Sequence, residues 1–175
     1  MPIPKSALGT VGEDEFFELV VVLGRGDFVC YPPRADFEGN DFLVRRRHRP
    51  AALAVQVKTR DYHDKMGNLT VAVEAEALPE GDPKLVVVFE YFTETAQFGR
   101  FAWAVPDSKY RELSTLTAGK YEATLSPKSG ARDRWVDYRY NREDLPWVVG
   151  FYLDQLLAAT RVELMGGPAR RSRKR

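Results

Sequence analysis

The segment "AVQVKTR", residues 54 to 60, reads as a buried β-strand that is interrupted by an amide and an ammonium. Successive side chains of a strand point to opposite faces, so Gln56 and Lys58 share one face while Val55 and Val57 share the other. Two polar groups of these types on one face indicate either a half-exposed strand or a functional site. The pairing of this strand with its neighbour determines which other groups join them.

The preceding segment, "DFLVRR", is predicted to form a hairpin with this strand, with residues 47 to 50 as the loop. Counting outward from the loop places Asp41 opposite Gln56, and opposed residues of an antiparallel pair share a face with Cβ atoms about 5 Å apart. A carboxylate, an amide oxygen and an ammonium therefore converge at Asp41, Gln56 and Lys58. A slip of one residue would instead place the Asp41 carboxylate among apolar side chains, at a high cost in free energy.

The wider pattern predicts one α/β domain with a mixed sheet, over residues 1–165. Thr10 and Glu13 have the spacing of a capping box before an apolar stripe, which predicts a helix from about Val11 to Gly24. Strands and further helices follow from alternating or continuous apolar runs and from helical spacing. The predicted strands lie within residues 27–33, 41–46, 51–59, 68–78, 84–92, 100–106 and 121–141, and the predicted helices within 107–116 and 145–164.

The order of these features resembles the core of the PD-(D/E)XK nuclease superfamily, whose architecture is the restriction-endonuclease-like fold. The features are a helix that carries glutamates, then "GND" ending at Asp41, then the hairpin, then "QVK" ending at Lys58. The sequence is more narrowly similar to the branch that has Gln in place of the second acid, as in Mrr-type restriction endonucleases. The resemblance covers residues 10 to 60 well and the downstream elements more loosely. It implies an α/β fold with a mixed central β-sheet flanked by helices.

The resemblance also implies roles for individual residues. Asp41 would coordinate a metal ion, Gln56 would be a neutral ligand through its side-chain oxygen, and Lys58 would position or activate the attacking water. Glu15 takes the place of the acid on the helix. Glu13 is the second candidate for that acid, because its predicted role in the capping box already accounts for it. The implied cofactor is Mg²⁺, or Mn²⁺ in its place, because such hard ions take oxygen ligands and lower the pKa of bound water.

Two departures from the family pattern bear on the metal. The family often has Asp-x-Gly-x-Asp here, whereas "DFEGND", from Asp36 to Asp41, has one extra residue, which leaves the role of Asp36 open. Gln56 also supplies one negative charge fewer than a Glu would. We therefore expect weak affinity for the ion, and a site that binds one ion.

Basic residues near these segments are candidates for binding nucleic-acid phosphates. One group lies at the hairpin tip and after the strand, and the other lies in a flexible tail that we expect for residues 166–175, which holds five of the 26 basic side chains. The candidates are Arg45, Arg47, Arg49, Arg60, Arg170, Arg171 and Arg173. The alternative interpretations are a solvated hairpin tip and a solubilising terminus.

Composition excludes several classes of protein. With 44% hydrophobic and 29% charged residues, the chain has the composition of an ordinary globular protein. The single cysteine, Cys30, cannot form an internal disulfide, and with only two histidines it cannot build a structural cysteine and histidine zinc site. No apolar stretch approaches the roughly 20 residues that span a bilayer, and the N-terminal residues lack the apolar core of a signal peptide. We therefore expect a cytoplasmic protein with no membrane partner.

Two functions of different classes fit the sequence. The first is a metal-dependent endonuclease that hydrolyses phosphodiester bonds of DNA, with RNA as the alternative substrate, in repair, restriction or mobile-element processing. The second is a nuclease-fold module that binds nucleic acid or a protein partner without cleaving. Retention of two acids and Lys58 favours the first, whereas the charge missing at Gln56 favours the second. Many members of the superfamily act as dimers, so the resemblance also makes a homodimer an expectation.

Overall fold

The computed structural model of the chain describes residues 4–32, 39–81 and 83–165. The predicted basic tail, with Arg170, Arg171 and Arg173, and the residue Asp36 lie outside this part of the chain. Within it, no helix is long and apolar enough to cross a membrane.

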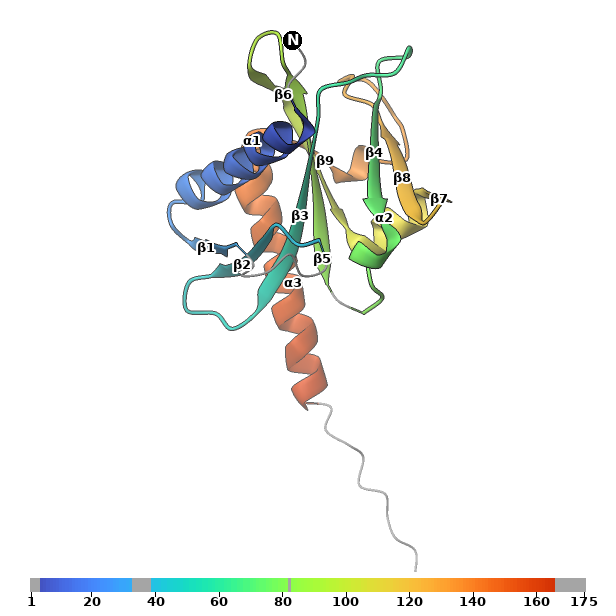
Figure 1. Ribbon diagram of the computed structural model, residues 1–175. Coiled ribbons are helices and arrows are strands. Elements are labelled where there is room, and N and C mark those ends of the chain that lie inside the picture. Colours follow the sequence, from blue (N-terminus) through green and yellow to red (C-terminus); the bar gives the residue numbers. More distant parts are fainter. Residues whose placement is uncertain (1–3, 33–38, 82, 166–175) are drawn as a thin grey trace, which may run out of the picture.

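The described chain forms two β-sheets and three α-helices (Figure 1). The larger sheet has six strands in the order β1, β2, β3, β5, β6, β9, in which β3 and β5 are parallel and the other neighbours are antiparallel. A smaller antiparallel sheet has the order β4, β8, β7. The elements are α1 (Lys5–Phe17), a π-helix (Glu18–Leu23), β1 (Phe28–Tyr31), β2 (Phe42–Arg46), β3 (Ala52–Arg60), β4 (Leu69–Glu74), β5 (Lys84–Phe92), β6 (Gln97–Pro106), α2 (Asp107–Leu113), β7 (Thr115–Thr117), β8 (Lys120–Leu125), β9 (Arg139–Asn141) and α3 (Leu145–Met165), with short 3-10 helices at Ala75–Ala77, Val136–Tyr138 and Arg142–Asp144.

The large sheet is buried on both faces. Helices α1 and α3 cover one face, where Phe16 of α1 and Val149 of α3 belong to the same apolar core as Val55 of β3 (Figure 1). The small sheet and α2 cover the other face, where Val71 of β4 packs in a second core with Val88 of β5. The predicted α/β fold with a mixed central sheet flanked by helices is therefore confirmed, and the fold adds a small sheet that the sequence did not indicate.

The first helix starts earlier than predicted. It begins at Lys5, after Pro4, whose fixed φ suits the start of a helix. The Thr10 hydroxyl lies inside the helix and donates a hydrogen bond to the backbone carbonyl of Ser6 at 3.3 Å. The predicted capping box of Thr10 and Glu13 is therefore wrong. Glu13 lies in the body of the helix, where its carboxylate has no capping role.

The hairpin of β2 and β3 has the predicted register. Phe42 pairs with Val55 and Val44 with Leu53, and all four side chains are buried in the core beneath α1 and α3. Beyond Phe42, the backbone N–H of Asp41 donates to the carbonyl of Val55 at 2.9 Å. Asp41 therefore lies opposite the β3 segment that carries the polar residues. Because β3 continues to Arg60 and stays paired with β5, its second half extends past the end of β2.

Candidate active site

A pocket of about 540 Å³ lies along the second half of β3, bounded by α1 on one side and by β4 on the other. It contains acidic and basic side chains in similar numbers. The charged residues that line it are Lys5, Glu13, Asp41, Lys58, Arg60 and Asp61. Two of the four predicted catalytic residues, Asp41 and Lys58, are therefore brought together here.

The Asp41 carboxylate is fixed to the edge of β3. Its Oδ2 atom accepts a hydrogen bond from the backbone N–H of Val57 at 2.6 Å, while its own N–H donates to Val55. The side chain thus adds one more hydrogen bond to β3, next to the end of the backbone pairing between β2 and β3. A carboxylate bound to a strand backbone in this way keeps its orientation when a ligand enters.

The Lys58 side chain extends from the second half of β3 into the same pocket. Burial lowers the pKa of its ammonium group, and the negative charge of Asp41 opposes that shift, as do the charges of Glu13 and Glu74 to a smaller extent. Lys58 is therefore a partly desolvated amine that faces carboxylates. Such an amine can bind an anionic oxygen more strongly than a fully hydrated lysine can.

Glu13 is the acid that α1 brings to this group. Burial raises the pKa of its carboxyl, the nearby charge of Asp41 raises it further, and Lys58 partly offsets both effects. The helix approaches β3 closely because Gly12 has no side chain: a Cβ atom there would overlap the Thr59 hydroxyl. Glu13, Asp41 and Lys58 thus form one electrostatically coupled cluster.

Glu15, the acid ranked first from the sequence, lies elsewhere. Its Oε1 atom is 3.2 Å from Nε of Arg142, an ion pair without hydrogen-bond geometry. Burial raises the pKa of the Glu15 carboxyl, and the charge of Arg142 lowers it. Residues two apart on an α-helix point in nearly opposite directions, so one helix cannot direct both Glu13 and Glu15 into the same pocket. The structure does not bring Glu15 to Asp41 and Lys58.

Gln56 lies next to the cluster but beneath the chain that precedes Asp41. It is only 4% exposed and does not line the pocket. A Cβ atom at Gly39, whose φ is +61°, would lie 2.9 Å from Nε2 of Gln56 and 3.0 Å from the side chain of Ala77. The Oε1 atom of Gln56 is buried and has no hydrogen-bond partner in the described part of the chain. Gln56 therefore offers an oxygen ligand that is enclosed.

The predicted nucleic-acid-binding arginines are split between two ends of β3. Arg60 lines the pocket and donates to the backbone carbonyls of Thr59 at 2.9 Å and Thr70 at 3.2 Å, which links β3 to β4. Arg45, Arg47 and Arg49 lie at the hairpin end, which the strand rise places about 20 Å from Lys58. The structure does not bring these three to the pocket.

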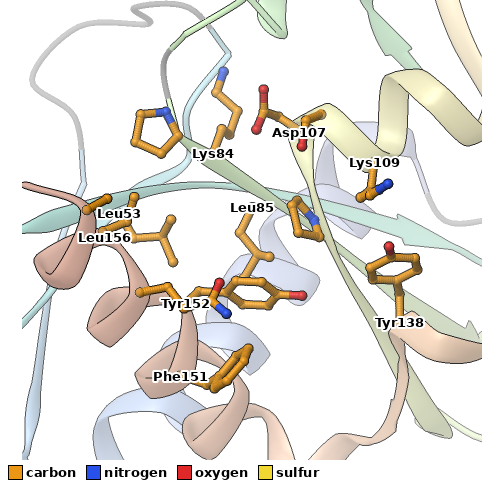
Figure 2. Close-up of a pocket in the computed structure, with 14 residues that line it drawn as sticks. Leu53, Lys84, Leu85, Asp107, Lys109, Tyr138, Phe151, Tyr152 and Leu156 are labelled. Atoms are coloured by element: carbon orange, nitrogen blue, oxygen red, sulfur yellow. The ribbon is translucent and has the colours of Figure 1, made fainter. Parts of the chain in front are cut away.

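A second pocket, of about 530 Å³, lies at the opposite end of the large sheet, beside α3 (Figure 2). Leu85, Tyr152 and Leu156 form its apolar part. Its buried charges already have structural partners, because Lys84 donates to the backbone carbonyl of Ala77 and Asp107 accepts from Arg111 at 2.7 Å. None of the predicted catalytic residues lines it.

The charge pattern of the first pocket suits a weakly bound hard cation. Burial raises the pKa of the Glu13 carboxyl and the negative charge of Asp41 raises it further, so a divalent ion between the two carboxylates would relieve their repulsion. In the described part of the chain, no three residues among His, Cys, Asp and Glu gather in a group that could hold a metal. The donor set therefore fits an ion that takes two carboxylates and keeps much of its water.

Comparisons with known proteins identify the fold. No family model matches the chain, and no curated protein matches it. The structure is similar to that of a bacterial homing endonuclease, I-Ssp6803I, with a TM-score of 0.58 and 17% identity over 89% of this chain and 98% of that one. A Holliday junction resolvase, Hjc from the archaeal hyperthermophile Archaeoglobus fulgidus, gives a TM-score of 0.43 and 15% identity over 66% of this chain and 82% of that one. The mixed six-stranded sheet with flanking helices matches the restriction-endonuclease-like fold.

Proposed function

We propose that this protein is a metal-dependent endonuclease of the cytoplasm that hydrolyses phosphodiester bonds of DNA. The observation that carries the proposal is the cluster of Glu13, Asp41 and Lys58 in one pocket at the edge of β3. An acid pair that can hold a metal ion, next to an amine that can bind a phosphate oxygen, supports phosphodiester hydrolysis, and the fold resembles that of a homing endonuclease. Glu13 takes the role that the sequence suggested for Glu15.

Glu13 and Asp41 are the residues that would hold Mg²⁺ or Mn²⁺. When bound, such an ion lowers the pKa of a coordinated water and stabilises negative charge at the phosphorus. Asp41 is oriented for this role by the N–H of Val57, and Glu13 by the packing of α1 on β3. Gln56 would add a neutral ligand if its enclosed oxygen faces the ion.

Lys58 would act on the substrate and the water. Its Nζ atom can donate hydrogen bonds to a non-bridging phosphate oxygen and to the attacking water, which aligns the two for displacement. Because burial lowers its pKa, the ammonium group gives up a proton more easily than that of an ordinary lysine. Arg60, in the same pocket, adds positive charge for the phosphate.

The test is incubation of the pure protein with plasmid DNA, single-stranded DNA and RNA in Mg²⁺, Mn²⁺ or EDTA. We expect cleavage in the presence of a metal ion, loss of cleavage in EDTA and in Lys58→Ala, and retention in Lys109→Ala, which removes a half-exposed lysine on α2. Cleavage by Lys58→Ala at the wild-type rate would exclude the assigned mechanism.

A second candidate function is binding of nucleic acid or of a protein partner without cleavage. The enclosure of Gln56 favours it, because the pocket then offers only two carboxylates to a metal ion. Under this function the wild-type protein binds DNA in a gel-shift assay, and no metal ion produces cleavage. Metal-dependent cleavage that Lys58→Ala abolishes would exclude it.

A further inference from the structure

The loop between β3 and β4, residues 61–68, exposes two large apolar side chains. Tyr62 is 72% exposed and Met66 is 73% exposed. Single exposed apolar residues are common on protein surfaces and need no explanation by themselves. Here the two share one short loop with the exposed Lys65, and that loop borders the candidate active site.

The loop is held in one shape by its own hydrogen bonds. Oδ1 of Asp64 accepts from the backbone N–H groups of Met66 at 2.8 Å and Asn68 at 2.9 Å. The backbone closes the same turn, because Asp64 donates to the carbonyl of Asn68 at 2.8 Å and Gly67 donates to the carbonyl of Asp64 at 2.9 Å. Hydrogen bonds from the Asn68 backbone and other groups lower the pKa of the Asp64 carboxyl. The negative charge of Asp64 is thus stabilised by hydrogen bonds within the turn.

The loop is also attached to the sheet. Nε2 of His63 lies 2.5 Å from Oε1 of Glu90, a buried residue of β5, and the His63 ring stacks on Phe92. At the other end of the loop, Nζ of Lys128 donates to the backbone carbonyl of Met66 at 2.9 Å. Because His63 directly follows Tyr62, its contacts with Glu90 and Phe92 anchor the start of the loop.

Tyr62 belongs to the wall of the candidate active site. It lines the same pocket as Asp41, Lys58 and Arg60. Tyr62 lies four positions after Lys58 in the sequence, which is a span of roughly 13 Å at most in extended chain. Along one strand of nucleic acid with a base every 3.4 Å or so, this span corresponds to about four nucleotides. An aromatic ring that follows cations along a groove near a phosphate site resembles the surfaces that bind single-stranded nucleic acid.

We propose that Tyr62, supported by Met66, stacks on an unpaired nucleobase of the strand whose phosphate is bound at Lys58. This inference rests on the proposed function and specifies its substrate class: nucleic acid with at least one unpaired base within about four nucleotides of the bond to be cut. A base inside a duplex has both faces covered by its neighbours, so a ring on a fixed loop can stack only on a base that has left the helix. Because the loop is already ordered, little conformational entropy is lost on binding.

The experiment measures binding in EDTA, where no cleavage is expected. The probes are a short single-stranded DNA with 2-aminopurine at one position and the duplex of the same sequence. The variants are Tyr62→Ala, Met66→Ala and Tyr62→Phe, with Trp147→Ala as the matched control, because Trp147 is 69% exposed but lies on α3. The three side chains that these variants change are largely exposed, and thermal unfolding checks that each variant folds.

We expect Tyr62→Ala to weaken single-strand binding about 5- to 100-fold and to abolish the change in 2-aminopurine fluorescence. Tyr62→Phe keeps the ring and should bind like the wild type, as should Trp147→Ala, while Met66→Ala should have a smaller effect. Duplex binding should be nearly insensitive to Tyr62→Ala. Wild-type binding that Tyr62→Ala leaves unchanged, or an equal loss with the duplex, would overturn this inference and leave the proposed function standing. Absence of any binding to DNA or RNA by the wild-type protein would overturn both.

Discussion

The Oδ2 atom of Asp41 accepts a hydrogen bond from the backbone N–H of Val57 at 2.6 Å. This bond joins the acid to the strand that carries Lys58 on the next position. The distance between a carboxylate and an amine of the candidate site is therefore set by the backbone of β3, which is paired with β5 along its second half. A site held by a central strand is more rigid than one held by loops.

Asp41→Asn and Asp41→Ala should separate the charge of this residue from its hydrogen bond. Asparagine keeps an oxygen that can accept from Val57, so we expect near wild-type stability but Mn²⁺ affinity at least about tenfold weaker in calorimetric titration. Alanine leaves the Val57 N–H without this acceptor, which should cost a further 1–3 kcal/mol or so in urea unfolding. Equal Mn²⁺ affinity in Asp41→Asn and wild type would remove Asp41 from the metal site.

Glu13→Gln and Glu15→Gln form a matched pair on one helix. We expect Glu13→Gln to lose metal binding and cleavage at least about tenfold, because Glu13 shares the pocket with Asp41. Glu15→Gln should keep both activities and lose only its ion pair with Arg142, worth roughly 1 kcal/mol in unfolding measurements. The reverse result would return the role of helix acid to Glu15.

Substitution by alanine at two glycines of α1 should change the stability of the protein in opposite directions. A Cβ atom at Gly12 overlaps the buried Thr59, so Gly12→Ala should destabilise the protein by about 1–3 kcal/mol and displace Glu13 from the pocket. A Cβ atom at Gly9 meets nothing within 4 Å, so Gly9→Ala should stabilise the helix by about 0.5–1 kcal/mol. Thermal unfolding measures both, and a neutral Gly12→Ala would contradict the close contact of α1 and β3.

Gln56→Glu should report whether the enclosed amide oxygen faces a metal ion. Burying a carboxylate there without a partner should cost about 3–5 kcal/mol in EDTA. If the oxygen faces the ion, Mn²⁺ should stabilise this variant more than it stabilises the wild type, as measured by the shift in Tm. Equal shifts would mean that Gln56 is not a ligand, which favours the binding module over the nuclease.

Cys30 should react slowly with thiol reagents in the folded protein. Burial raises the pKa of its thiol from 9.0 to about 11, which lowers the thiolate fraction near pH 8 about 100-fold relative to the unfolded chain. Labelling should accelerate sharply in urea. The control is Leu116→Cys in a Cys30→Ala background, which places a thiol at an exposed position of β7. Equally fast labelling of the two native proteins would contradict the burial of Cys30.

The hairpin at the candidate site was predictable because any shift of its register would cost free energy. A slip of one residue would have buried Asp41 among valines, so the sequence allowed one pairing, and the structure has it. The start of α1 was not predictable in the same way. A threonine followed by a glutamate three residues later also occurs within helices, and the stronger signal was Pro4.

The choice between Glu13 and Glu15 depended on where α1 meets the sheet. The buried positions Leu8, Gly12 and Phe16 recur every four residues and mark the side of the helix that packs on β3. This spacing was present in the sequence, but the predicted helix started at about Val11 and so did not include Leu8. The small sheet was beyond sequence reasoning for another reason, since β4 pairs with β8 about fifty residues away, and local patterns do not specify distant partners.

The pairing of β2 with β3 ends where Phe42 faces Val55, yet β3 continues to Arg60. A strand edge left open in this way can recruit an extended segment from another molecule, which is a common route to aggregation. Here the Asp41 carboxylate accepts the hydrogen bond of the Val57 N–H, and the missing side chain at Gly12 lets α1 lie against Thr59. The Asp41 carboxylate therefore blocks part of this edge as well as lining the pocket. Variants at Asp41 and Gly12 should be checked for light scattering before a loss of activity is assigned to catalysis.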